Sequence, residues 1–262
     1  MNFIDPDGRT VKWWWFLGLV DPISSVSTAL ATASTLAGMA GTIAGVTYTT
    51  TVINSLFMLG KSSGNSGNPN IVRNMWRINN SLFVTNKNKS FGGRVWEFFF
   101  RFTWEVPQTS IGYYYTQGRN MIGRVDRVDY FDGATFAIRE NAGGGDGMSL
   151  GNYINMNITG EITGDFQDWV LANPMFMHEY GHTFDSRAWG PLYLPVVGLP
   201  SLISAANQRN IDGEPGVTTH DFRIYEMRAN RKAAKYFERY GVDWDAPLGR
   251  HTIETFYPRI KR

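Results

Sequence analysis

The chain has 262 residues, of which 43% are hydrophobic and 15% aromatic, a composition sufficient to bury one substantial core. Its 25 basic residues against 23 acidic residues give a formal charge of +2, so the strongly basic composition of a nucleic-acid-binding protein is missing and no nucleic-acid partner is expected. The chain has no cysteine, which excludes disulfides and thiolate metal ligands.

The first residues carry a turn-forming Asp-Pro-Asp-Gly stretch within residues 2–9. This segment resembles the end of an Rhs/YD-repeat core, where a large β-cage gives way to a variable C-terminal toxin. The resemblance implies that residues 1–20 are the remnant of this boundary. It also implies secretion or delivery to a target cell as part of a larger toxin, and an immunity protein as partner. The alternative is an ordinary turn. Two acidic residues before the aromatic cluster at residues 13–16 do not fit a signal peptide, so none is expected.

Residues 22–60 carry no charge and are rich in Ala, Gly, Ser, Thr and Leu. Small residues four apart, such as Gly41 and Gly45, let helices approach closely in a bilayer, and the length suffices for one span. The many threonines dilute this apolar character and favour a helix or hairpin packed on the main domain. We therefore expect residues 21–61 to form a helical segment that either contacts a membrane or packs against the protein.

Residues 62–69 are rich in Ser, Gly and Asn and end in Pro, which is typical of a flexible linker. Residues 70–262 are then expected to form the catalytic domain. Its first half has the composition of β-structure. The expected strands and turns are residues 95–106, residues 113–115, residues 125–131, a hairpin turn at Asp132-Gly133 and a loop at residues 143–147.

Apolar and polar residues then alternate from Ile154 to Thr159, as in a strand with two different faces. We expect residues 149–159 to form one strand. It lies either at the edge of the sheet, where it could pair with an extended substrate, or in the interior.

The most informative stretch is His178-Glu179-Tyr180-Gly181-His182, an H-E-x-x-H element. Residues four apart lie on one face of a helix, so both imidazoles can point at one metal ion. Glu179 then lies where it can take a proton from a water molecule that the metal activates. Asn173 and Pro174 predict the start of a helix that runs to Trp189 and is stopped by Gly190-Pro191.

A catalytic zinc site needs a third protein ligand. The extended metzincin pattern is excluded, because Asp185 and Ala188 stand where it requires Gly and His. The best alternative is Glu226, on the apolar side of a second predicted helix over residues 221–240, with Thr218 and Thr219 as caps. The alternative interpretations are a buried Glu226 paired with an arginine, or a Glu226 that simply lies at the edge of the apolar stripe. Asn230, four residues on, could hydrogen-bond a ligand histidine and fix its tautomer.

Together, His178, Glu179, His182, Glu226 and Asn230 resemble the gluzincin branch of the zincin metallopeptidases, although that family usually has Asp where this chain has Asn230. The resemblance implies an α+β fold: a twisted, mainly antiparallel sheet, then an active-site helix and a C-terminal ligand helix. It also implies zinc as cofactor and a protein or peptide as substrate.

The expected mechanism is peptide-bond hydrolysis with His178, His182 and Glu226 as zinc ligands and Glu179 as general base. An additional donor should stabilise the oxyanion. The sequence does not rank the four candidates, His220, Arg223, Tyr193 and Tyr225. Two rival classes stay open: a zinc hydrolase of a non-protein amide or ester, and a membrane-perturbing effector that acts through residues 22–60 and has a vestigial zinc site. The stretch from Leu192 to Gly216 is expected to bear loops that shape a specificity pocket.

Overall fold

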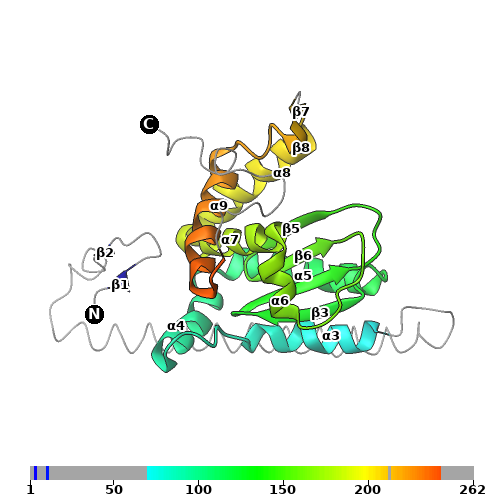
Figure 1. Cartoon of the computed structure of the whole chain (residues 1–262). Coiled ribbons are helices and arrows are strands. Elements are labelled where there is room, and N and C mark those ends of the chain that lie inside the picture. Colours follow the sequence, from blue (N-terminus) through cyan, green and yellow to red (C-terminus); the bar gives the residue numbers. More distant parts are fainter. Residues whose placement is uncertain (1–2, 5–9, 12–69, 212–213, 243–262) are drawn as a thin grey trace, which may run out of the picture.

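The computed structural model describes residues 3–4, 10–11, 70–211 and 214–242 (Figure 1). At the N-terminus, β1 (Phe3–Ile4) pairs antiparallel with β2 (Thr10–Val11). The predictions for the uncharged residues 22–60 and the linker 62–69, and most of the predicted boundary segment 1–20, lie outside the described residues.

A four-stranded mixed sheet forms the centre of the α+β fold. Its strands are β3 (Arg127–Phe131), β4 (Ala134–Arg139), β5 (Asp146–Leu150) and β6 (Tyr153–Asn157), in the order β3-β4-β6-β5. The β3–β4 and β5–β6 pairs are antiparallel, and β4 and β6 run parallel. The predicted hairpin turn is confirmed: Asp132 and Gly133 join β3 to β4 with positive φ angles of 44° and 84°, as this tight turn requires.

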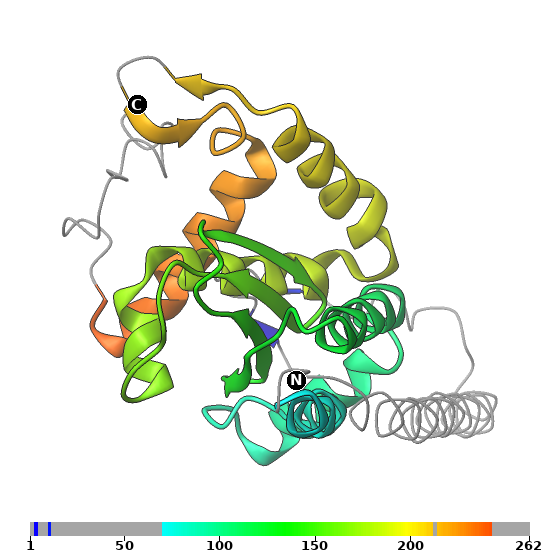
Figure 2. The same ribbon diagram turned by 90° about the vertical axis from the view of Figure 1, so that its right-hand side faces the viewer.

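Helices cover both faces of this sheet (Figure 1, Figure 2). On one face, Phe136, Ile138, Ile154 and Met156 pack in a core with α6 (Phe166–Ala172), α7 (Pro174–Trp189) and α9 (Ile224–Phe237). On the other face, the intervening side chains Ala137 and Tyr153 pack with α3 (Ile71–Asn80) and α5 (Val106–Met121). The alternation predicted for β6 is therefore confirmed, but its polar face is also buried: Asn155 donates a hydrogen bond to Thr116 Oγ1 on α5 over 3.0 Å.

The strands predicted at residues 95–106 and 113–115 are wrong. The first stretch lies largely in α4 (Phe91–Arg101) and runs into the start of α5, and the second lies within α5. A composition rich in Phe, Trp and Tyr favours strands, but here the spacing of the buried residues is that of helices. The buried face of α5 repeats every three to four residues and is mostly polar or small, so a search for apolar periodicity does not detect it. Its members are Gln108, Thr109, Gly112, Tyr113, Thr116, Gln117 and Asn120.

The expectation of one strand over residues 149–159 is also wrong. Ser149 and Leu150 end β5, Gly151 turns the chain with a φ of 65°, and β6 follows. Because β6 lies between β4 and β5, it is an interior strand, and β5 is the edge strand of the described sheet on this side. The strand that lies along α7 is therefore Asp146–Leu150.

The stretch between the two ligand helices is mostly helical, contrary to the loop-bearing segment expected there. It contains η2 (Gly190–Leu192), the π-helix η3 (Leu194–Gly198), α8 (Leu199–Ala206) and the hairpin of β7 (Asn210–Ile211) and β8 (Glu214–Thr218).

The C-terminal ligand helix also begins later than predicted. It starts at Ile224 and ends in η4 (Glu238–Tyr240), and Thr218 belongs to β8 instead of capping the helix. Gly241 follows with a φ of 75°, the conformation that glycine favours after a helix. Among the described helices, none is by itself long and apolar enough to cross a membrane. One pair bent by 120°, Pro174–Leu192 with Leu194–Ala206, meets the length and composition requirement only when taken together.

Candidate metal centre

The helix that carries the H-E-x-x-H element has the predicted bounds, Pro174 to Trp189. Asn173 occupies the N-cap position, but its side chain does not cap α7; Asn173 Nδ2 instead donates to the Trp169 carbonyl of α6 over 2.6 Å. Gly190 ends the helix at a φ of 52°, where a Cβ would overlap the indole of Trp104. Both histidines therefore lie within a regular helix, one turn apart on the same face.

Gly181, inside the motif, sets how closely α9 approaches α7. A Cβ at Gly181 would overlap the main-chain carbonyl of Ala229 on α9, and backbone atoms cannot move aside as a flexible side chain can. The absence of a side chain at this position thus lets the two helices pack nearly backbone to backbone. This close packing brings Glu226, one turn before Ala229, up to the two histidines.

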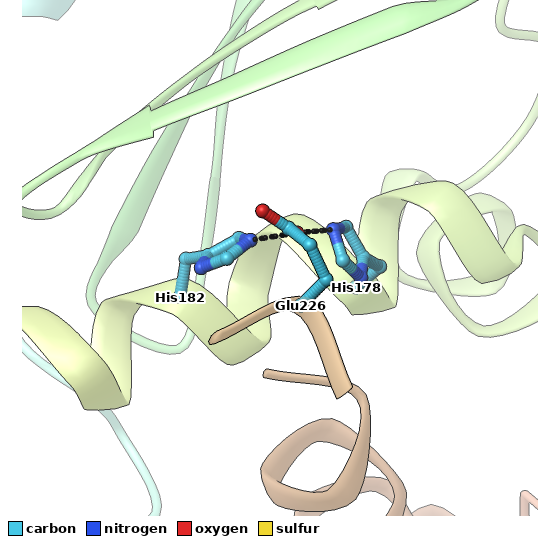
Figure 3. Close-up of side chains that lie close together, drawn as sticks. All are labelled: His178, His182 and Glu226. Atoms are coloured by element: carbon cyan, nitrogen blue, oxygen red, sulfur yellow. Dashed lines mark hydrogen bonds and ion pairs between the residues drawn. The ribbon is translucent and has the colours of Figure 1, made fainter. Parts of the chain in front are cut away.

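His178, His182 and Glu226 converge on one point (Figure 3). One ligand atom from each lies within 4.8 Å of the other two. Glu226 Oε2 is 2.9 Å from His182 Nε2 and 3.2 Å from His178 Nε2. Glu226 is only 2% exposed, whereas the His178 side chain is 22% exposed, so the site opens on the side of His178. This buried group could hold a metal ion.

Asn230 touches the first histidine as expected. His178 Nδ1 lies 2.6 Å from Asn230 Oδ1. Because an amide oxygen only accepts hydrogen bonds, this contact keeps the proton on Nδ1 and leaves the Nε2 lone pair facing Glu226 when the ring is neutral. That is the tautomer a metal ligand requires.

In the absence of a metal, protons neutralise this cluster. Burial disfavours the charged form of His178, but the hydrogen bond and negative charge of Glu226 outweigh it and raise the pKa of His178 to about 9. The pKa of His182 is raised by the same balance. Burial would raise the pKa of Glu226, yet the two imidazoles lower it well below its usual range. The cluster therefore attracts positive charge, which a bound cation could supply in place of the protons.

Two imidazole nitrogens and one carboxylate oxygen form a donor set that fits a metal ion with an open coordination position. Glu179 extends from α7 toward β5 and is almost fully buried. Ser149 Oγ lies 2.6 Å from Glu179 Oε2 and 2.8 Å from the Glu179 carbonyl oxygen. A Cβ at Gly147 would come within 2.6 Å of Glu179 Cγ, so this glycine leaves the space that the side chain occupies.

The sequence prediction missed the roles of Ser149 and Gly147. Their spacing of two does place them on the same face of a strand, but no local pattern shows that this face meets α7. Ser201, on α8, was missed as well: its hydroxyl donates to Glu226 Oε1 over 2.6 Å. A serine within an apolar helix carries no signal for such a contact.

The four candidate oxyanion donors lie at different places. His220 contacts the cluster directly, with its Nε2 3.3 Å from Glu226 Oε1. The other three contact the segments around it. The Tyr193 hydroxyl donates to the Ser149 carbonyl of β5, Tyr225 donates to the Pro200 carbonyl, and Arg223 Nε donates to Ser204 Oγ.

No protein family, no curated protein and no solved structure matches this chain. The function proposed below therefore rests on the residues of this chain.

Proposed function

We propose that this chain is a zinc-dependent peptidase. The observation that carries the proposal is the convergence of His178 and His182 with Glu226, 44 residues further along the chain than His182, beside Glu179. A His₂Glu donor set is typical of catalytic zinc sites, which keep one coordination position open. When bound, zinc would lower the pKa of a water molecule to about 7 and polarise a carbonyl group.

Glu179 is the proposed general base and acid. Its carboxylate accepts a proton from the attacking water while the water oxygen bonds to the carbonyl carbon. Glu179 then returns the proton to the amide nitrogen, and the C–N bond breaks to give a carboxylic acid and an amine, which exchange a proton to become carboxylate and ammonium. The Ser149 hydroxyl, 2.6 Å from Glu179 Oε2, limits how far this side chain can turn away from the cluster.

An extended peptide is the substrate that the surroundings favour. β5 is an edge strand of the described sheet and lies along α7, so its outer edge could pair with an incoming strand, although the Ser149 carbonyl on β5 already accepts a hydrogen bond from Tyr193. Such pairing would draw a peptide past the open side of His178. This mode of substrate binding is the one expected from the resemblance of α7 and α9 to the zincin metallopeptidases.

Replacing Glu179 with Gln tests the proposal. We expect the variant to keep its zinc and to lose turnover by about 10²- to 10⁴-fold, because the amide cannot accept the proton. Zinc content is measured by elemental analysis, and turnover with casein and a quenched fluorescent peptide library. His182→Ala is the control, which should lose both zinc and turnover. A Glu179→Gln protein as active as wild type would contradict the mechanism.

The wild-type and Glu179→Gln proteins also distinguish a peptidase from a hydrolase of non-protein amides or esters. Digestion of peptidoglycan fragments or simple esters by the wild type, with no cleavage of peptides, would move the reaction to a non-protein amide or ester. The metal site would be the same in either case, so only the substrate decides.

We further propose that the chain acts as a toxin delivered by a larger protein and restrained by an immunity partner. This rests on the resemblance of residues 2–9 to an Rhs boundary. Expression of wild type in bacterial cytoplasm and periplasm should arrest growth in at least one compartment, and Glu179→Gln should not. A toxic Glu179→Gln protein would favour membrane damage through residues 22–60.

A further inference from the structure

The two carboxylate oxygens of Glu226 have different surroundings. Oε2 faces the imidazole nitrogens of both ligand histidines. Oε1 accepts a hydrogen bond from Ser201 Oγ over 2.6 Å and lies 3.3 Å from His220 Nε2. One oxygen is thus available to a cation, while the other is bound by groups of the protein.

Ser201 reaches this oxygen because α8 packs with its small and polar side toward α9. Ser201 and Ser204 both contact α9 or the residue before it, through Glu226 and Arg223. The large aliphatic side chains of α8 point away from the protein and are more than half exposed; they are Leu199, Leu202 and Ile203. Apolar burial therefore contributes little to holding α8 in place, and polar contacts with the ligand helix position it.

A short hydrogen bond to an ionised carboxylate is among the stronger ones in proteins. It fixes the rotation of the Glu226 carboxyl group and occupies the lone pairs of Oε1. A carboxylate restrained in this way binds a cation through one oxygen. A freely rotating carboxylate could offer both oxygens and fill the coordination position that a substrate needs.

We propose that Ser201 is a positioning residue for Glu226: its hydroxyl, with His220 as a second contact, restrains the carboxylate so that only Oε2 binds the metal. This inference rests on the metal site of the proposed function. It assigns α8 a part in metal binding, although none of its residues is a ligand.

The test compares Ser201→Ala with Ser201→Thr, which keeps a hydroxyl, and with Ser204→Ala, which removes a hydroxyl from the same helix without touching Glu226. Zinc affinity of the full chain is measured by competition with a chromophoric chelator, and coordination by the visible absorption of the cobalt(II)-substituted protein. We expect Ser201→Ala to weaken zinc binding by about 10- to 100-fold, the usual effect of removing a partner of a ligand. Its cobalt bands should weaken, as expected when the carboxylate binds through both oxygens and raises the coordination number.

Ser201→Thr should restore most of the affinity and the cobalt spectrum, and Ser204→Ala should match wild type. A Ser201→Ala protein with wild-type affinity and spectrum would overturn the inference while leaving the zinc site intact. An equal loss in Ser204→Ala would point to a general disturbance of α8 and also overturn it. A wild-type protein that binds neither zinc nor cobalt would overturn the proposed function together with this inference.

Discussion

Two carboxylates lie buried between α7 and α9, and they are neutralised by different kinds of partner. Asp185, on α7, is 0% exposed and meets two cations of α9: Lys232 Nζ at 2.9 Å and Arg228 Nε at 2.6 Å. Glu226, on α9, is 2% exposed and meets the imidazoles of His178 and His182. The same helix pair thus holds one carboxylate paired with a lysine and an arginine and one carboxylate paired with histidines.

The two sets of partners differ in whether they could bind a metal ion. A protonated ammonium or guanidinium group has no lone pair for a metal ion, so Lys232 and Arg228 cannot act as ligands, and their ion pairs with Asp185 hold the two helices together. A neutral imidazole offers a lone pair, and its proton can be exchanged for a metal ion. Glu226 is therefore compensated by partners that a cation can replace. The interpretation of Glu226 as the partner of an arginine does not hold among the described residues, since its ion-pair partners are histidines.

Neutralising each carboxylate in turn should distinguish the two sites most clearly. Asp185→Asn leaves the buried Lys232 without its counter-charge, and we expect the free energy of unfolding to fall by about 3–5 kcal/mol. Glu226→Gln should lower zinc affinity by more than about 100-fold, because it changes a proposed ligand, whereas removing a residue that only hydrogen-bonds a ligand costs up to about 100-fold. Its metal-free stability should fall less, because the histidines can release their protons.

Chemical unfolding in the presence of a chelator and zinc competition measure the two effects. Asp185→Asn should weaken zinc binding by no more than about tenfold. A small loss is expected because Asp185 Oδ2 lies 3.9 Å from Nδ1 of the ligand His182. If Asp185→Asn mainly weakened zinc binding and Glu226→Gln mainly lowered the free energy of unfolding, the distinction between the two carboxylates would be contradicted.

Gly181 should affect both sites together, because it sets the approach of the two helices. Gly181→Ala forces a methyl group against the Ala229 carbonyl, so we expect a loss of about 1–3 kcal/mol in unfolding free energy and weaker zinc binding. Thermal unfolding and zinc competition measure this loss.

Gly118→Ala is the matched control for this substitution. Gly118 also lies in a helix, but a Cβ there meets nothing within 4 Å. This control should be neutral or stabilised by up to about 1 kcal/mol, the difference in helix propensity. Equal behaviour of the two alanine variants would show that close helix contact is not required.

A further expected effect is one of pH. The pKa of His178 is raised from its ordinary value near 6.5 to about 9 in the metal-free protein. A raised folded-state pKa contributes stability that is fully present below pH 6.5 and is lost as the pH rises through about 9. Thermal unfolding of the chelated protein should therefore shift to lower temperature over this range, and Glu226→Gln should flatten the shift.

Zinc binding should also release protons from this cluster. At pH 7.5 we expect the release of at least about one proton per zinc ion bound, because both histidines must be neutral to bind the metal. Calorimetry in buffers of different ionisation enthalpy counts these protons. Zinc binding without proton release would show that Glu226 does not hold the histidines in their charged form.

The candidate site was largely predictable because its parts depend on spacing within one helix. His178 and His182 are four positions apart, as are Glu226 and Asn230, and a helix places each pair on one face whatever surrounds it. The bounds of α7 followed from Pro174 and Gly190, and the β3–β4 turn from Asp132-Gly133, for equally local reasons.

Most other contacts between segments that lie far apart in the chain were not predictable. Lys232, for example, is buried against Asp185, a residue 47 positions earlier in the chain. The helices α4 and α5 replaced predicted strands, because their buried faces are recognised only by what packs on them.

Residue spacing in the sequence showed which side chains could form a metal site and on which helices they lie, because backbone geometry sets the positions within one element. The folded domain then brings Glu226 to the histidines, makes β5 the edge strand beside Glu179, and places Ser149 and Ser201 in contact with the two carboxylates. Those contacts join segments separated by many residues, and they form only when the packing of the whole domain brings the segments together.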